Sequence, residues 1–422
     1  MLDPKYIREH AEEVKENVRA RRLEIDVDAF LQTDAERLAL LKQAEDLRHE
    51  RNIVAEQMKS VPSDERSALI ERGKTLKERV SAIDGSLEAC EAVWKDLLHR
   101  MPNSVHPDVP PGASDEENKE IKRWGTIARP AFPLKNHMEL AEALDLIDFA
   151  RGTKVAGSKW YFLKGKLVLL EQALIQYGLQ FAVREGFLPM MTPDVAKEAV
   201  LLGKGFLPRG PEKQVYYVEG EDLALIGSSE ITLLGYHMDE MLPAEEMPKK
   251  YTAFSHCYRT EAGSYGRESY GLYRVHQFSK VELFAFAMPK QSEAIHQEFL
   301  RIEEAFWQSL GIPYRVVDCC VGDLGAPDYR RYDIEAWMWG KNEGKGGWGE
   351  VTSTSQCGEY QSRGLHIKYE QDGEKEYVHT LNGTMVATPR TLICIMEHFQ
   401  KEDGSISVPE VLQPFCGFDR IG

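Results

Sequence analysis

The sequence lacks several features that would place it in large classes of protein. No apolar run approaches the roughly 18 residues that a membrane-spanning helix requires. The first residues are charged and contain no apolar segment, so we expect neither a secretory signal nor an organelle-targeting peptide. The seven cysteines are scattered and form no Cys-x-x-Cys pair. This pattern predicts reduced thiols in a cytoplasmic protein and no zinc site.

The chain also lacks a phosphate-binding loop and an overall basic charge. The glycine-rich residues 340–349 contain no Gly-Lys-Ser/Thr leading from a strand into a helix, so we expect a hairpin tip there. The net charge of −16 does not suggest a general nucleic-acid binder. Residues 48–79, however, hold eight Lys and Arg against six Asp and Glu, so a local contact with nucleic acid stays open.

The first hundred residues are dominated by a heptad pattern of apolar residues. One seam consists of Leu69, Leu76, Val80, Ile83, Leu87, Cys90, Trp94, Leu97 and Met101, and the other of Leu40, Ala44, Leu47, Arg51, Val54 and Met58. A turn at residues 60–65 separates them, which predicts an antiparallel coiled-coil hairpin over about 28–98. Such a hairpin serves either to reach a partner or to form a dimer, and the heptads do not distinguish these roles.

The rest of the chain has a different texture. We expect a helical arm domain at 1–105, a Pro-rich and acidic linker at 106–120, and a catalytic domain at 121–422. Helical patterns near 136–150 and 165–185 are mixed with short strand-like runs at 215–218, 251–258, 314–320 and 365–369. This order favours an α+β domain with an antiparallel sheet.

Residues 254–284 form the most informative segment, a strand, a polar turn at 262–270 and a second strand from Leu272. Arg259 and Glu261 are two residues apart and so face the same way on a strand. The second strand would place Arg274, His276, Phe278, Lys280 and Glu282 on one face. That face is a poor core and indicates a site, although an exposed hairpin with a charged outer face is the alternative.

These segments resemble the signature motifs of class II aminoacyl-tRNA synthetases, most closely the bacterial and mitochondrial type of seryl-tRNA synthetase. Residues 254–284 resemble motif 2, with R-x-E-A-G before the loop and G-L-x-R-V-H-Q-F-x-K-V-E after it. Residues 380–390 resemble motif 3, and residues 184–193 resemble motif 1, the dimer-interface segment. The N-terminal hairpin is similar to the long arm of the same family, so the resemblance covers the whole chain in order.

The resemblance implies a ligase that joins L-serine to tRNA. Serine and ATP would form seryl-adenylate, and the serine would then pass to the 3′-hydroxyl end of tRNA(Ser), and of tRNA(Sec) where that is present. The family implies a homodimer, Mg²⁺, and tRNA binding through the N-terminal arm, with no membrane contact. The serine carboxylate is already ionised at neutral pH, so the protein has to supply position and positive charge rather than a nucleophile.

The resemblance also assigns residues to roles. Arg259 would contact the α-phosphate and the serine carboxylate, Arg390 the γ-phosphate, and Glu350 the metal, and these three are the catalytic residues. The ATP-binding set is Arg259, Thr260, Glu261, Val275, Phe278, Glu350, Val351, Thr352, Ser353 and Arg390. The serine-binding set is Ser228, Ser229, Glu230, Arg259, Glu282, Asn382 and Thr384. Phe278 would stack on adenine, and Glu350 and Ser353 would be the metal ligands, since Mg²⁺ prefers oxygen donors.

Two positions depart from the family pattern. Ser228 stands where a threonine is usual, which predicts a slightly looser serine pocket, and Gly364 stands where a second arginine is usual. The alternatives are a related ligase that adenylates an amino acid for a non-tRNA acceptor, and a catalytically silent binding paralogue. The intact heptads argue against the first, and the presence of Arg259, Arg390 and Glu350 argues against the second.

Overall fold

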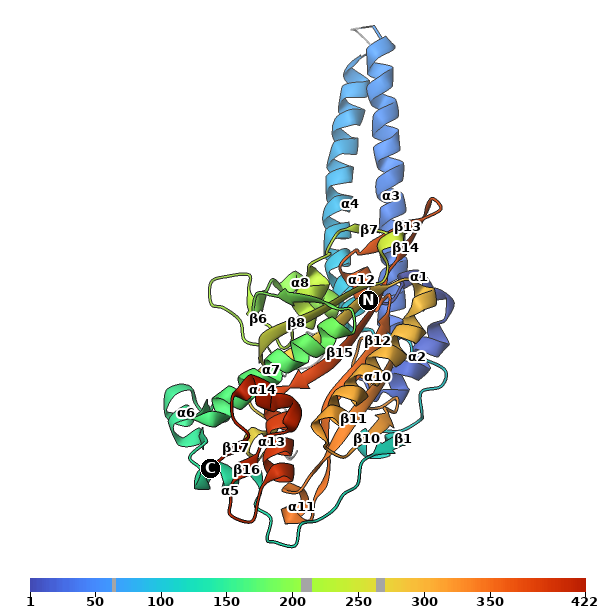
Figure 1. Ribbon diagram of the computed structural model, residues 1–422. Coiled ribbons are helices and arrows are strands. Elements are labelled where there is room, and N and C mark those ends of the chain that lie inside the picture. Colours follow the sequence, from blue (N-terminus) through green and yellow to red (C-terminus); the bar gives the residue numbers. More distant parts are fainter. Residues whose placement is uncertain (63–65, 206–214, 263–269) are drawn as a thin grey trace. The chain divides into compact units, whose positions relative to one another are not determined.

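The computed structural model describes residues 1–62, 66–205, 215–262 and 270–422 (Figure 1). The chain divides into two compact units, one of residues 2–102 and one of residues 103–422 together with Met1. Among the described residues, no helix is both long and apolar enough to cross a membrane.

The first unit is helical. It contains α1 (Pro4–Glu9), α2 (Ala11–Ala20), α3 (Val27–Ser60) and α4 (Arg66–Arg100). The side chain of Asp26 accepts a hydrogen bond from the amide of Ala29 and so caps the start of α3. The long helices α3 and α4 pack together as an antiparallel hairpin, which confirms the predicted helical hairpin.

The predicted heptad residues hold the two long helices together. Leu47 and Val54 of α3 and Leu76 and Val80 of α4 form a buried cluster. Near the other end of the hairpin, the indole of Trp94 donates a hydrogen bond to the carboxylate of Asp34 at 2.8 Å. Of the predicted turn at 60–65, residues 63–65 lie outside the described part of the chain.

The second unit is built on an eight-stranded sheet. Its strand order is β1 (Lys119–Trp124), β10 (Tyr314–Asp318), β11 (Arg330–Met338), β12 (Gly347–Gly358), β15 (His379–Ala387), β9 (Gln277–Ala287), β8 (Lys249–Tyr258) and β4 (Leu188–Met191). Neighbouring strands are antiparallel except β4, which runs parallel to β8 at the edge. This confirms the predicted α+β fold with an antiparallel sheet and flanking helices.

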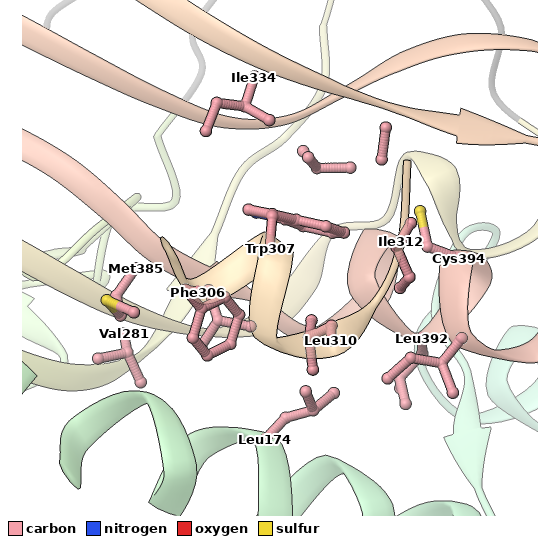
Figure 2. Close-up of a cluster of buried hydrophobic side chains, with 14 of the residues drawn as sticks. Leu174, Val281, Phe306, Trp307, Leu310, Ile312, Ile334, Met385, Leu392 and Cys394 are labelled. Carbon is pink, nitrogen blue, oxygen red and sulfur yellow. The ribbon is translucent and has the colours of Figure 1, made fainter. Parts of the chain in front are cut away.

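The three longest helices of this unit contribute to the main hydrophobic core together with the sheet. They are α7 (Lys166–Arg184), α10 (Ser292–Leu310) and α13 (Thr388–Phe399). Figure 2 shows Phe306 and Trp307 of α10 between Leu174 of α7 and Ile334 of β11. Both aromatic side chains are fully buried, so α10 is anchored firmly beneath the strands.

Shorter elements complete the fold. They are η1 (Asp115–Glu117), α5 (His137–Ala143), β2 (Ile147–Asp148), α6 (Phe149–Ala156), β3 (Phe162–Leu163), β5 (Val195–Ala196), α8 (Glu198–Lys204), β6 (Ala224–Leu225), α9 (Glu230–Gly235), β7 (Met241–Pro243), η2 (Ala244–Glu246), η3 (Gly271–Tyr273), η4 (Pro289–Gln291), α11 (Lys341–Gly344), α12 (Tyr360–Gly364), β13 (Lys368–Gln371), β14 (Glu374–Tyr377), β16 (Ile406–Ser407), η5 (Glu410–Leu412), α14 (Gln413–Cys416) and β17 (Arg420–Ile421).

The helical stretch predicted near 136–150 forms two short helices, α5 and the start of α6, with a break between them. Asn136 forms a capping box at the start of α5, and Asp148 accepts a hydrogen bond from the amide of Arg151 at the start of α6. Between them Asp145 has a φ of 52°, which a continuing helix excludes. The predicted helix at 165–185 agrees with α7.

The strand predictions also shift in places. Residues 251–258 and 314–318 lie in β8 and β10, whereas the run at 365–369 is replaced by β13 three residues later. The run at 215–218 forms only an isolated bridge at Tyr217. The return strand of 254–284 begins at Gln277 rather than Leu272, because a 3₁₀ turn occupies residues 271–273.

Most of the predicted linker packs within the second unit. The amide of His106 donates a hydrogen bond to the carbonyl of Tyr329, and the carbonyls of Pro110 and Gly112 accept hydrogen bonds from the amides of Val321 and Gly322. Val109 packs against a small cluster that includes Val317 of β10. The segment therefore has its own tertiary contacts.

Candidate active site

A cavity of about 210 Å³ opens over the middle of the large sheet. Its walls come from the end of β8, the start of β9, the bulged part of β12, the end of β15 and the start of α13. The lining residues are Arg259, Glu261, Leu272, Tyr273, Arg274, Val275, Phe278, Lys280, Glu350, Val351, Thr352, Ser353, Thr384, Ala387, Pro389 and Arg390. Segments that are far apart in the sequence thus converge on one polar hollow.

Arg259 lies directly after β8, where the strand ends. Its amide donates a hydrogen bond to the carbonyl of His276, which ties the strand end to the return segment. The guanidinium donates from Nε and Nη2 to the carbonyl of Gly227, each at 3.3 Å, and lies 5.3 Å from the ring centre of Phe278. A planar cation is therefore held beside an aromatic face inside the cavity.

Glu261 follows with an unusual backbone. Its φ of 52° is rare for a residue other than glycine and costs of the order of 1 kcal/mol, a kind of strain that gathers at functional sites. The carboxylate accepts a hydrogen bond from Arg274 at 2.5 Å. Both side chains line the cavity, so this ion pair forms part of its wall.

Glu350 and Ser353 share a face only because β12 contains an extra residue. On a regular strand, residues three apart face opposite ways. Here Glu350 pairs with Glu335 of β11 while Ser353 pairs with Asp333, so Val351 is bulged out of the register. Since residues 333 and 335 lie on one face of β11, Glu350 and Ser353 lie on one face of β12.

The same bulge turns Thr352 to the other side of the sheet. Its hydroxyl donates a hydrogen bond at 2.8 Å to the buried carboxylate of Glu303 on α10. Desolvation raises the pKa of Glu303 well above its usual value. The side chain of Thr352 therefore joins β12 to α10, and only the backbone of Thr352 is left to contact a ligand in the cavity.

Opposing effects set the charge on Glu350. Burial works to raise its pKa, but the positive charge of Arg390, and after it that of Arg331, outweighs burial and holds the pKa below its usual value. Arg390 Nη1 lies 3.3 Å from the carboxylate and donates to the Glu350 carbonyl at 2.8 Å. Glu350 is thus an ionised oxygen donor at neutral pH, and with Ser353 on the same face it fits a hard divalent cation.

Arg390 is placed by the first turn of α13. Pro389 precedes it near the helix start, where its fixed φ suits the helix and its missing N–H is not needed. The guanidinium lies 4.6 Å from the ring centre of Tyr273 and donates to that residue's carbonyl. An arginine at the N-terminus of a twelve-residue helix adds to the positive end of the helix dipole and favours an anion.

The other end of the site is built on β9 and β15. Thr384 pairs directly with Glu282, and Asn382 pairs with Phe284, so Asn382, Thr384 and Glu282 share one face. A second extra residue, Met385, follows Thr384. Register through β12, where Ser355 pairs with Asn382, places this face on the same side of the sheet as Ser353.

Glu282 is buried beside Lys280. The two side chains form an ion pair, although Glu282 Oε2 receives no hydrogen bond of good geometry from the described residues. Burial lowers the pKa of Lys280 to about 8. All of β9 from Ser279 onward is buried, so the alternative of an exposed charged hairpin is wrong.

Glu230 begins α9 and is held from several elements. One carboxylate oxygen accepts hydrogen bonds from Gln361 at 2.8 Å and Asn382 at 3.1 Å, and the other lies 3.0 Å from the ammonium group of Lys204. The hydroxyl of Ser228 accepts a hydrogen bond from the amide of Glu230. The hydroxyl of Ser229 donates to the carbonyl of Ala253 on β8, so its side chain has a structural partner.

The cavity collects ten of the sixteen predicted site residues. They are Arg259, Glu261, Val275, Phe278, Thr384, Arg390 and the run Glu350, Val351, Thr352 and Ser353. The others, which do not line it, are Thr260, Ser228, Ser229, Glu230, Glu282 and Asn382. Asn382 connects the two groups, because it contacts Glu230 and shares the face of Thr384.

The sequence reasoning missed Tyr273, Lys204 and Gln361 as members of the site, and it placed Arg274 on the site face without giving it a role. Tyr273 lies in motif 2 and could have been found there, but Lys204 and Gln361 reach Glu230 only through the packing of α8 and α12. A second cluster, Cys319, Asp323 and Asp333, has donor atoms close enough for a metal. The guanidinium of Arg331 contacts all three side chains, so its positive charge takes the place that a metal ion would have there.

Comparison with known proteins agrees with this geometry. Residues 215–399 match the family model of the class II tRNA synthetase core domain (G, H, P, S and T), and residues 1–105 match that of the seryl-tRNA synthetase N-terminal domain. The serine–tRNA ligase of Treponema denticola is 49% identical over 100% of both chains. That of Rubrobacter xylanophilus is 48% identical over 100% of this chain and 99% of the relative.

Solved structures give the same result. A crystal structure of seryl-tRNA synthetase from Pyrococcus horikoshii complexed with ATP has a TM-score of 0.89 and 36% identity, over 100% of this chain and 99% of that one. The cytoplasmic serine–tRNA ligase of Naegleria fowleri in complex with AMP has a TM-score of 0.84 and 32% identity, over 100% of this chain and 98% of that one. The chain belongs to the seryl-tRNA synthetase family of class II aminoacyl-tRNA synthetases.

Proposed function

We propose that the chain activates L-serine with ATP and transfers the serine to the 3′-hydroxyl end of tRNA(Ser). One observation carries this proposal: Arg259, Phe278, Glu350 and Arg390 line a single cavity whose floor continues to Glu282 and Thr384. The direct test is serine-dependent exchange of pyrophosphate into ATP, followed by charging of tRNA(Ser). Exchange without charging would favour a non-tRNA acceptor, and no exchange would favour a silent paralogue.

The proposed first step needs positioning rather than acid–base catalysis. A serine carboxylate oxygen attacks the α-phosphorus, and the bond to pyrophosphate breaks. Arg259, held beside Phe278, can contact both the serine carboxylate and the α-phosphate, while Arg390 at the start of α13 suits the γ-phosphate. The 3′-hydroxyl oxygen of tRNA then attacks the serine carbonyl carbon and its proton is lost, and AMP leaves as the bond between its phosphate oxygen and that carbon breaks. Both steps benefit from fixed charge in a partly dry site.

Mg²⁺ fits the residues present. Glu350 is ionised, and the bulge at Val351 places Ser353 on its side of the sheet, so two oxygen donors face the cavity together. We propose these two as its protein ligands. When bound there, the metal would neutralise phosphate charge and so favour nucleophilic attack on phosphorus.

The adenine subsite is proposed at the motif 2 end of the cavity. Phe278 offers a ring face, and Val275 lines the same cavity. Glu261, fixed by Arg274, offers a carboxylate that can accept a hydrogen bond from an exocyclic amine. Of the polar turn predicted at 262–270, residues 263–269 lie outside the described part of the chain.

Restoring the usual threonine at position 228 should sharpen the choice of serine over threonine. Ser228 is buried at the start of the α9 turn, and the added methyl group of Ser228→Thr would narrow the serine end. A methyl-sized change in a tight pocket changes selectivity by tenfold or more in favourable cases, so we expect a several-fold rise here. The measurement is kcat/KM for exchange with serine and with threonine. An unchanged ratio would remove the looser-pocket idea.

We propose that the hairpin of α3 and α4 binds tRNA(Ser), and tRNA(Sec) where that is present. The helices have 34 and 35 residues and extend for about 50 Å at about 1.5 Å per residue. Their locally basic stretch suits contacts with a phosphate backbone. We propose on this basis a functional division of the chain. It consists of a tRNA-binding arm at 1–105, a linker at 106–120 and a catalytic domain at 121–422.

A homodimer is proposed through the motif 1 region. β4 is an edge strand whose Leu188 and Met191 are 58% and 88% exposed, and Val183 at the end of α7 is also exposed. Apolar side chains on a free edge favour burial against a second copy. Met191→Asp should therefore weaken the dimer, and a monomer of the unaltered chain by sedimentation would contradict the proposal.

The seven cysteines are all free, which supports the proposed cytoplasmic location.

A further inference from the structure

The serine end of the site contains a buried ion pair that the family resemblance does not assign. Lys204, the last residue of α8, lies with its ammonium group 3.0 Å from a carboxylate oxygen of Glu230. The two side chains are only 13% and 7% exposed. We propose that Lys204 is a positioning residue for serine binding, which fixes the Glu230 carboxylate for the substrate. This inference rests on the proposed assignment of Glu230 to the serine subsite.

Lys204 completes the support of Glu230. An ionised carboxylate has about four acceptor positions. Gln361 of α12 and Asn382 of β15 donate to one oxygen, and Lys204 of α8 contacts the other. With both oxygens tied from three separate elements, the carboxylate plane cannot turn freely. One acceptor position then remains for the serine ammonium or hydroxyl group.

A close contact between two glycines places Lys204. Gly203 of α8 and Gly364 of α12 lie backbone against backbone. A Cβ added at Gly364 would lie 2.3 Å from the carbonyl oxygen of Gly203 and 2.7 Å from its Cα. A Cβ added at Gly203 would lie 2.3 Å from the side chain of Leu365 and 2.9 Å from the carbonyl of Gly364. The end of α8 can therefore approach Glu230 only because both positions lack side chains.

This contact gives the unusual Gly364 a physical role. The family resemblance would place a second arginine at this position. Any side chain at 364 is incompatible with the present place of Gly203, so a cation from α12 and Lys204 from α8 exclude each other here. In this chain the positive charge beside Glu230 comes from α8.

The charge balance of the serine end is consistent with this role. The buried carboxylates Glu230 and Glu282 are matched by Lys204 and Lys280. The charges of Glu230 and Lys204 both affect the pKa of Lys280, so the two ion pairs interact electrostatically. Removing Lys204 would leave Glu230 as a buried charge without its cation, which is strongly destabilising for the local arrangement.

The test compares Lys204→Met, Lys204→Arg and the control Lys250→Met in serine-dependent exchange. Lys250 of β8 forms a similar ion pair with Glu298 at 2.6 Å, and it does not line the cavity. We expect Lys204→Met to raise the KM for serine by about tenfold or more while the KM for ATP stays within about twofold. Lys204→Arg should recover much of the loss, because it keeps the charge, and Lys250→Met should leave both constants unchanged.

Gly364→Ala provides a second route, because it leaves Lys204 in the chain and pushes the end of α8 away. It should raise the KM for serine without changing the KM for ATP. The control Gly85→Ala, where an added Cβ meets nothing within 4 Å, should have no effect. This route also decides the matter if Lys204→Met fails to fold.

Three results would overturn the proposal. An unchanged KM for serine in Lys204→Met would show that the ion pair does not support binding, and a lowered KM would show that Lys204 competes with the serine ammonium. Equal losses for serine and ATP would indicate a general structural role. Glu230→Gln separates this inference from the proposed function: if it leaves the KM for serine unchanged, the assignment of Glu230 itself is wrong.

Discussion

Replacing Arg259 with lysine is expected to lower serine-dependent ATP–pyrophosphate exchange by about a hundredfold or more. Lysine keeps the charge but loses the planar fork that can contact a phosphate and a carboxylate together. Loss of one well-placed donor to a developing charge typically costs two to three orders of magnitude. Arg259 is held for this task by the carbonyl of Gly227 and the ring of Phe278. The measurement is kcat/KM for exchange.

A matched substitution tests whether the effect is local. Arg315 of β10 forms an ion pair with Glu335 at 2.6 Å, and because neither residue lines the cavity, Arg315→Lys should retain exchange. The melting temperature of both variants should stay close to that of the unaltered chain. A loss of less than about tenfold in Arg259→Lys would show that the residue does not contact the reacting phosphate.

Shortening the arm should abolish charging and spare activation. Deleting residues 45–84 and joining Ala44 to Gly85 by a short Gly-Ser turn removes the outer hairpin, including the basic stretch. The base of the hairpin, with Trp94 packed on Phe30 and bonded to Asp34, remains. Because the removed part would hold the tRNA and not the small substrates, we expect tRNA(Ser) charging to fall about a thousandfold, which corresponds to about 4 kcal/mol of binding. Exchange should stay within about twofold.

Two outcomes would contradict the proposed role of the arm. Charging that survives the deletion would mean that tRNA is recognised elsewhere, and exchange that falls along with charging would mean that the arm supports the catalytic unit. The dependence of charging on salt provides a further check. Contacts with phosphates weaken steeply as salt rises, so charging by the full chain at subsaturating tRNA should be the more salt-sensitive activity.

Local patterns in the sequence were sufficient to predict the arm. Leu47, Val54, Leu76 and Val80 repeat at heptad spacing and lie buried between α3 and α4, because a coiled coil encodes its partner surface along each helix. The segment 136–150 shows the limit of this reasoning. It does contain helices, but the backbone at Asp145 and the cap at Asp148 divide it into two.

The site residues were proposed from motifs, and much of their convergence depends on sheet register. Glu350 and Ser353 share a face because Val351 is an extra residue, and the register after Thr384 depends in the same way on Met385. A bulge is defined by pairing between strands that are distant in the sequence, so neither strand alone reveals it. The spacing of Glu350 and Ser353 by itself would have predicted opposite faces.

The sequence by itself determined the family, the helical arm, the antiparallel α+β class and the motif residues that carry the proposed chemistry, because these depend on local periodicity and on short segments. The tertiary structure alone decided which motif residues share a face, that Thr352 turns away to Glu303, and that Lys204 reaches Glu230. These features depend on bulges and on the contact of Gly203 with Gly364. Such packing is settled only when remote segments fit together with few voids and with their buried charges paired.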